Sequence, residues 1–209
     1  NLLSRINLRN TSFSEQLPIA DLHWIFTDQT GASIVVEAVA DGLKIYDNPV
    51  GILTNNPPFN EHLFGLNNYM HLSAASPQNT FAPGLELKEY SRGMGAIGLP
   101  GDLSSESRFV KATFTKFNSL SADDEMSSVS QFFHILHSVD QQNGCCNLGN
   151  NHYEYTIYSD CYNLNEGIFY YTAYNNHQIS AIKMHNADLD TSEFTRIPII
   201  ETEQINYQN

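Results

Sequence analysis

The chain has 209 residues, 41% hydrophobic and 16% charged, a composition typical of a globular protein with a sizeable core and unlike that of a disordered chain. Its 10 Lys and Arg stand against 23 Asp and Glu, and the net charge of -13 argues against nucleic acid or acidic membrane surfaces as partners. No apolar run approaches membrane-spanning length and no signal peptide opens the chain. We therefore expect a single cytoplasmic domain over residues 1–209.

The first residues, NLLSRINLRN, have the apolar spacing of the end of a helix and lack an initiator Met, which indicates a fragment. Three short runs separated by turn residues then predict an antiparallel meander. They are DLHWIFTD, expected to bury one face strongly, SIVVEAV and LKIYD. A further strand over residues 51–54 is predicted to stop at the amides of Asn55 and Asn56, before two prolines.

The middle of the chain predicts helices and one long loop. Leu63, Leu66 and Met70 have helical spacing, but a glycine and two asparagines make that helix weak. Residues 74–103 carry five Gly and three Pro with little periodicity, as functional or mobile loops do. Two helices follow, one with a serine start over residues 104–120 and one with an acidic start over residues 123–139. The second is expected to bring together Val129, Phe132, Leu136 and Val139.

Strands are predicted again toward the C-terminus, in YEYTIYSDCYN, GIFYYTAYNN, QISAIKMH and TRIPII. Strands, then helices, then strands predict an α+β fold in which antiparallel sheets are covered by a helical layer. The tyrosines of these strands are interpreted as sheet packing, although a stacking platform is the alternative.

Other candidate sites are weak. His134 and His137 lie three apart on a helix, but no acid or cysteine joins them at ligand spacing, so no metal is expected. The run GMGAIG neither follows a clear strand nor opens a helix, and we interpret it as a loop and not a phosphate cradle. The three cysteines, Cys145, Cys146 and Cys161, are interpreted as reduced thiols. No cofactor is predicted.

Two residues remain as candidates for chemistry. Asn55 is either a turn-capping amide or a rigid donor to a developing oxyanion. Arg108, one turn into a predicted helix, is either a solvated side chain or a buried cation beside a thiol, where it would favour the thiolate.

The combination of GILTNNPPFNEHLFGLNNY, GLPGDLSSESRFV, FFHIL and EYTIYSDCYNLNEGIFYYTAYNNHQI closely resembles the choloylglycine hydrolase family, in particular its bile salt hydrolases, with the penicillin V acylases as a sister group. The resemblance implies an N-terminal-nucleophile hydrolase with an αββα sandwich, a cytoplasmic homotetramer that cleaves bile acids from glycine or taurine. By motif, Asn55 matches the oxyanion amide and Arg108 the arginine beside the cysteine nucleophile. A loop bordering the steroid pocket makes Phe13 and Leu17 expected apolar contacts.

The family's N-terminal cysteine has no counterpart here, because residue 1 is Asn1 and none of the three cysteines lies in a family motif. We therefore expect a missing N-terminal segment to carry the nucleophile, and this polypeptide alone to be inactive. Penicillin V acylase is the alternative activity, and a non-catalytic steroid-binding fragment is the alternative of another class.

Overall fold

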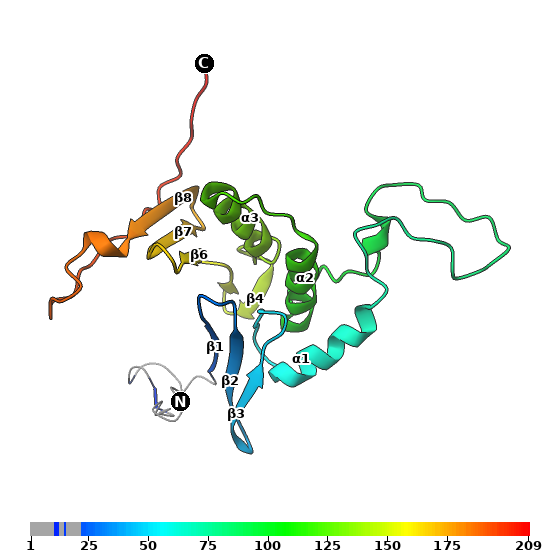
Figure 1. Ribbon diagram of the computed structural model, residues 1–209, viewed down its shortest axis with the longest axis horizontal. Coiled ribbons are helices and arrows are strands. Elements are labelled where there is room, and N and C mark those ends of the chain that lie inside the picture. Colours follow the sequence, from blue (N-terminus) through cyan, green and yellow to red (C-terminus); the bar gives the residue numbers. More distant parts are fainter. Residues whose placement is uncertain (1–10, 13–14, 16–21) are drawn as a thin grey trace.

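The computed structural model describes residues 11–12, 15 and 22–209, and it arranges them as antiparallel strands beside a group of helices (Figure 1). The elements are, in chain order, β1 (His23–Thr27), β2 (Ser33–Val39), β3 (Gly42–Asp47), α1 (Phe59–Gly65), α2 (Ser105–Asn118), α3 (Glu125–His137), β4 (Cys146–Gly149), β5 (His152–Glu154), β6 (Tyr158–Asn163), β7 (Ile168–Ala173) and β8 (Asn176–Lys183). Short 3-10 turns lie at Leu66–Tyr69, Met94–Ala96 and Met184–Asn186.

The first sheet is the predicted meander, with antiparallel strand order β1-β2-β3. The expectation that β1 buries one face strongly is wrong for the described residues, since Leu22 and Phe26 are 38% and 36% exposed. Successive side chains of a strand point to opposite faces of its sheet. The helices cover the face of β2 that carries Val35, where Phe59 and Phe109 complete a core cluster. Trp24 and Phe26 pair in register with Val36 and Ile34, so they lie on the opposite face of the sheet from Val35.

Residues 51–54 form no strand, contrary to the prediction. The side chain of Asn48 turns the chain instead: its Oδ1 accepts a hydrogen bond from Gly51 N at 2.8 Å and its Nδ2 donates to Ile52 O at 3.1 Å. Gly51 has a φ of 63°, which glycine adopts without strain. Because this turn directs the chain away from the edge of β3, residues 51–54 have no ladder partner among the described residues.

The start of α1 is capped from a distance. Its N-cap residue, Pro58, makes no side-chain cap, and the backbone N of Phe59 donates to both carboxylate oxygens of Glu37, at 3.1 and 3.0 Å. Glu37 is 3% exposed and its Oε1 also lies 3.1 Å from Nδ1 of His23. A carboxylate from β2 thus satisfies an N–H that the helix leaves unpaired. The weak helix predicted here is confirmed, since α1 passes into a 3-10 turn at Leu66.

The predicted long loop projects away from the rest of the chain, between α1 and α2 (Figure 1). It contains no strand or α-helix among its described residues, and only the 3-10 turn Met94–Ala96 interrupts it. That turn follows Gly93, which has a φ of 80°, so GMGAIG belongs to a loop as expected. The loop returns to the body of the chain at the N-terminus of α2.

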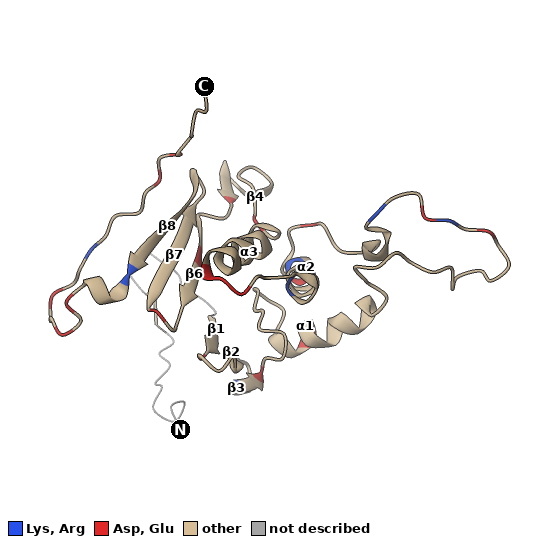
Figure 2. Cartoon of the chain, turned by 45° about the horizontal axis from the view of Figure 1, so that its top comes forward, with Lys and Arg blue, Asp and Glu red and all other residues tan. Residues whose placement is uncertain are grey.

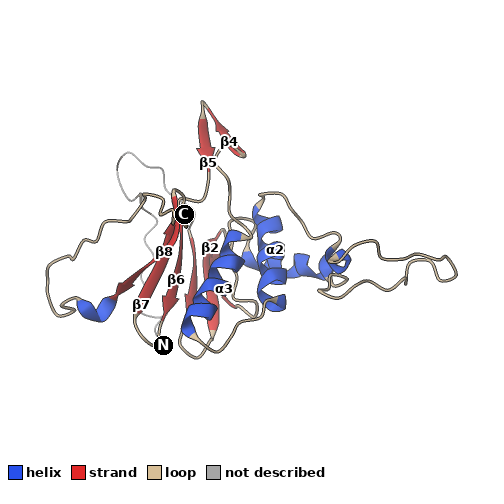
Figure 3. Cartoon of the chain, turned by 90° about the horizontal axis from the view of Figure 1, so that it is seen from above, coloured by secondary structure: helices blue, strands red, loops and turns tan. Residues whose placement is uncertain are grey.

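The two central helices confirm their predicted starts. The side chains of Ser104 and Asp124 accept hydrogen bonds from the backbone three residues onward and cap α2 and α3. Seen from above, the two helices lie side by side along the strands (Figure 3). The predicted core stripe of α3 is wrong at Phe132, which is 43% exposed, because Phe133 takes the buried place beside Val129. The side chains of α3 that face the second sheet at this point are therefore Val129 and Phe133, four residues apart, and not Val129 and Phe132, three apart.

The second sheet has the antiparallel order β6-β7-β8 and is covered on one face by α3. Ile168 and Tyr170 pack against α3, so the interpretation of the tyrosines as packing residues holds for Tyr170 and for the buried Tyr171. The predicted strand in TRIPII is wrong, because residues 195–200 have no ladder partner among the described residues. The predicted single strand YEYTIYSDCYN is wrong, because it is interrupted at residues 155–157: β5 pairs with β4 in a separate two-stranded sheet, and β6 belongs to the second sheet.

Acidic side chains are distributed over the loops and elements, whereas the few basic ones lie mainly on α2, the projecting loop, β8 and the C-terminal tail (Figure 2). No described helix is both long enough and apolar enough to span a bilayer.

The buried carboxylate of Glu37 predicts a test of the fold. Glu37→Ala should lower the free energy of unfolding by about 1–3 kcal/mol, because it leaves the N–H of Phe59 buried without an acceptor. Glu37→Gln keeps one carbonyl oxygen for that N–H and should lose less. Urea unfolding of the protein measures both, and equal losses in the two variants would contradict the capping role.

Candidate active site

The structure brings Asn55 and Arg108 into direct contact although they lie 53 residues apart. Nη2 of Arg108 donates a hydrogen bond to Oδ1 of Asn55 at 2.5 Å. Because a guanidinium can only donate, the oxygen of the amide must face Arg108, and its Nδ2 points elsewhere. No described residue accepts a hydrogen bond from that Nδ2. The pair therefore presents one fixed, unpaired amide donor next to a fixed positive charge.

Arg108 is positioned by the start of α2. Its Nε donates to the carbonyl oxygen of Leu103 at 3.1 Å, which ties the guanidinium to the turn before the helix. Burial lowers the pKa of Arg108 from its usual value, and the carboxylate of Glu154 and the thiolate form of Cys146 act in the opposite direction. A guanidinium remains charged across the physiological range. Arg108 is thus a half-buried cation with its fork directed at Asn55.

Asn55 itself is exposed in the described chain, and its geometry comes from neighbours on both helices. Nε2 of His62, on α1, lies 2.9 Å from the carbonyl oxygen of Asn55. The adjacent residue, Thr54, donates through Oγ1 to the carbonyl oxygen of Ser105 at 3.0 Å and accepts from Ser105 Oγ at 3.0 Å. Residues 54 and 55 are therefore held by α1, through His62, and by the first turn of α2, through Ser105.

Sequence reasoning did not identify His62, Thr54 or Ser105. A lone histidine on a short helix carries no motif signal, and Thr54 and Ser105 belong to segments that spacing alone does not bring together. The only available signal was their closeness in sequence to Asn55 and Arg108.

The predicted apolar contacts Phe13 and Leu17 lie outside the described residues. Within the described ranges no group of three or more His, Cys, Asp or Glu side chains is placed to hold a metal ion. His134 is exposed, and Nε2 of His137 lies 3.2 Å from Oγ1 of Thr172.

All three cysteines are free thiols, as expected. Burial raises the pKa of Cys161, and the neighbouring Asp160 raises it further. A thiol in such surroundings is a poor nucleophile at neutral pH.

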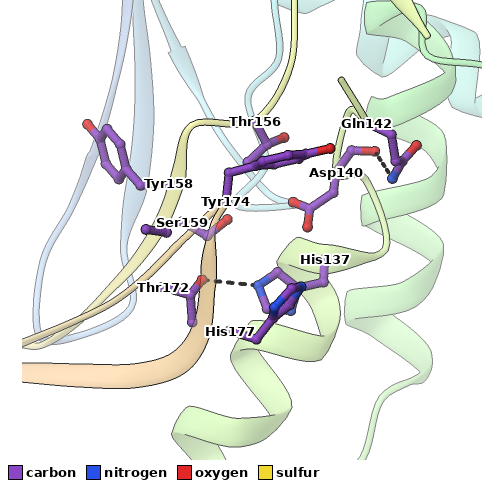
Figure 4. Close-up of a pocket in the computed structure, with 10 residues that line it drawn as sticks. His137, Asp140, Gln142, Thr156, Tyr158, Ser159, Thr172, Tyr174 and His177 are labelled. Atoms are coloured by element: carbon purple, nitrogen blue, oxygen red, sulfur yellow. Dashed lines mark hydrogen bonds between the residues drawn. The ribbon is translucent and has the colours of Figure 1, made fainter. Parts of the chain in front are cut away.

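A separate cavity of about 280 Å³ lies between the end of α3 and the second sheet (Figure 4). His137, Asp140 and His177 are among its lining residues. Burial raises the pKa of Asp140, while the two histidines act to lower it. Nδ1 of His177 lies 2.6 Å from a carboxylate oxygen of Glu203, and His137 contacts Thr172, so both imidazoles have a partner. Neither Asn55 nor Arg108 lines this cavity, which is therefore distinct from the candidate site.

The chain is similar to known proteins of one enzyme family. Residues 1–196 match the family model described as linear amide C-N hydrolases, choloylglycine hydrolase family. A bile salt hydrolase/transferase of Lactiplantibacillus plantarum is 55% identical over 197 residues, which are 94% of this chain and 60% of that protein. One of Clostridium perfringens is 35% identical over 207 residues, 99% of this chain and 63% of that protein. The chain thus spans about three fifths of the length of these curated relatives.

The solved structure of a conjugated bile acid hydrolase mutant from Clostridium perfringens superimposes with a TM-score of 0.84 at 35% identity, covering 96% of this chain and 61% of that one. A penicillin V acylase from Agrobacterium tumefaciens shares the fold at a TM-score of 0.59 and 20% identity, over 80% of this chain and 46% of that one. These likenesses confirm the expected fold class, an α+β arrangement of antiparallel sheets flanked by helices of the N-terminal-nucleophile hydrolase type. By its family match and its identity to these relatives, the chain belongs to the choloylglycine hydrolase family of linear amide C-N hydrolases.

Proposed function

We propose that the protein hydrolyses the amide bond joining a bile acid to glycine or taurine. The observation that carries the proposal is the contact between Arg108 and Asn55, which leaves the amide Nδ2 unpaired beside a cation. The 55% identity to a protein named bile salt hydrolase/transferase supports the substrate class. The nucleophile in this proposal is an N-terminal cysteine on a segment outside the present chain, whose own α-amino group serves as the base.

In the proposed reaction the two residues have separate roles. The thiolate attacks the amide carbonyl, and the carbonyl oxygen becomes an oxyanion in the tetrahedral intermediate. Nδ2 of Asn55 donates a hydrogen bond to that oxyanion, a stabilisation that exists only after attack. Arg108 holds Oδ1 of Asn55 and adds positive charge, which favours the thiolate over the thiol. Collapse of the intermediate releases glycine or taurine and leaves an acyl-enzyme that water hydrolyses.

Turnover by the full-length protein that carries this chain tests the proposal. Taurocholate and glycocholate should be hydrolysed, the N-terminal Cys→Ala variant should be inactive, and residues 1–209 alone should be inactive. Penicillin V acylase activity is the second candidate, favoured only by the shared fold. A strong preference for phenoxymethylpenicillin over taurocholate would replace the first candidate with the second. Bile-salt binding without hydrolysis of either substrate would indicate a non-catalytic steroid-binding protein.

We also propose that the enzyme is a cytoplasmic homotetramer. The exposed apolar side chains of the described chain, among them Phe64, Met70 and Phe117, support association with further protein surface. Light scattering on the full-length protein measures the subunit number.

We predict that Asn55→Ala in the full-length enzyme lowers kcat by about 10²–10³-fold with little change in KM, because the amide acts on the intermediate and not on bound substrate. Asn55→Asp retains an oxygen for Arg108 but loses the N–H donor, and it should be at least as slow. Asn68→Ala removes an exposed amide of the following 3-10 turn and serves as the matched control. Equal losses in kcat and in substrate affinity would argue against the oxyanion role.

We predict that Arg108→Ala moves the pH dependence of nucleophile alkylation to higher pH by about one pH unit, since loss of a nearby cation raises a thiol pKa. Iodoacetamide labelling of the N-terminal cysteine, followed by mass spectrometry across pH, measures the shift. Arg92→Ala is the control, because Arg92 is exposed on the projecting loop and contacts only Glu89 among the ion pairs of the described chain. An unchanged pH profile of alkylation in Arg108→Ala would contradict the proposal that Arg108 lowers the pKa of the nucleophile thiol.

A further inference from the structure

We infer that His62 is a positioning residue for the oxyanion amide, an inference that rests on the proposed hydrolysis. The imidazole acts through the backbone of Asn55 and does not touch the substrate in this account. It holds the carbonyl oxygen of Asn55 and thereby fixes the peptide plane from which the Asn55 side chain projects.

Asn55 needs such a support because its backbone belongs to no sheet. Residues 51–54 have no ladder partner in the described chain, and Asn55 is exposed. The hydrogen bond from Arg108 fixes only the end of the side chain. Without a donor to the backbone carbonyl, the peptide between Asn55 and Asn56 could rotate and carry Nδ2 away from its position.

His62 is the donor that remains for this carbonyl among the described residues. Two hydroxyl groups, of Thr54 and Ser105, lie 3.4 Å from Nε2 of His62. Both of their protons are already committed, since Ser105 Oγ donates to Thr54 Oγ1 and Thr54 Oγ1 donates to the Ser105 carbonyl. Because the Asn55 carbonyl only accepts, Nε2 of His62 must carry a proton and donate it to that oxygen.

The ring of His62 is itself rigidly placed. His62 is 1% exposed and its ring stacks on Phe109 with a centroid distance of 4.8 Å and an interplanar angle of 22°. The imidazole of His62 thus contacts both the backbone of Asn55 and the ring of Phe109, which is the residue after Arg108 on α2. Nδ1 of His62 is buried and has no partner among the described residues. His62 therefore makes two kinds of contact: its ring packs on Phe109, and its Nε2–H donates to the carbonyl oxygen of Asn55.

In the proposed reaction, loss of the His62 donor matters because an oxyanion donor must be placed to within about 1 Å. Such donors act at 2.7–3.1 Å from the developing oxyanion, and a displacement of about 1 Å can cost 10²-fold in rate. Loss of the His62 donor should therefore act on kcat. It should leave KM nearly unchanged, because in the proposed reaction the Asn55 amide acts on the intermediate and not on bound substrate.

Three variants of the full-length enzyme test the inference with taurocholate as substrate. His62→Phe keeps a flat ring on Phe109 but has no donor, and we expect kcat to fall by roughly 10–100-fold with KM within about twofold. His62→Gln restores an N–H donor and should recover kcat to within about threefold of wild type. His134→Phe replaces an exposed histidine of α3 and should change neither constant. Thermal unfolding of each variant is measured alongside.

Equal loss of kcat in His62→Phe and His62→Gln, accompanied by equal loss of thermal stability, would reduce His62 to a packing residue and overturn the inference. Wild-type kcat in His62→Phe would overturn it as well. A measurement independent of substrate is the ¹⁵N spectrum of labelled histidine, assigned with the Gln variant. It should show Nε2 of His62 protonated, and an Nδ1–H tautomer would overturn the inference. A wild-type enzyme that hydrolyses no conjugated bile salt but shows the Nε2–H tautomer would count against the proposed function alone.

Discussion

The segment from Asn48 to Phe59 has no strand partner in the described chain, so its conformation depends on hydrogen bonds from side chains. At its start, the side chain of Asn48 bonds to the backbone of Gly51 and Ile52 and forms the turn that leaves the first sheet. At its end, the carboxylate of Glu37 accepts a hydrogen bond from the backbone N–H of Phe59, at the start of α1. Between these anchors, the Asn55 carbonyl and side chain are held by His62 and Arg108. With its side-chain oxygen held by Arg108, Asn55 keeps Nδ2 without an acceptor among the described residues.

The start of α2 is the other half of this arrangement. Asp102 accepts hydrogen bonds from the backbone of Ser104 and the hydroxyl of Ser107, and contacts with these serines lower its pKa to about 2. This bonding orders the turn whose Leu103 carbonyl receives Nε of Arg108. A depressed carboxyl pKa stabilises the folded state above the ordinary value of 3.8, and that contribution is lost as pH falls through about 2. The support of Arg108 by Asp102 is therefore intact throughout the neutral range.

The sequence was sufficient where local rules decide structure. The meander, the serine and acidic helix starts and the long loop follow from periodicity, capping and turn residues, which act over a few neighbours. It was insufficient where burial depends on distant elements. Phe132 and Phe133 both suit a helix stripe, and only the position of the second sheet selects Phe133. Likewise, the β-branched residues near 195–200 suit a strand, but a strand forms only with a partner.

The candidate site divides in the same way. The sequence offers Asn55 and Arg108 as candidates and the family resemblance implies their roles, whereas their contact and the support from His62 depend on how α1 and α2 pack. That packing buries Phe59, Phe109 and His62 almost completely, directly beneath an exposed amide. A rigid core under a solvent-facing polar pair is a costly arrangement for a turn cap, because an exposed turn can be capped by water. It suits the proposed role of Asn55, a donor whose partner appears only during reaction.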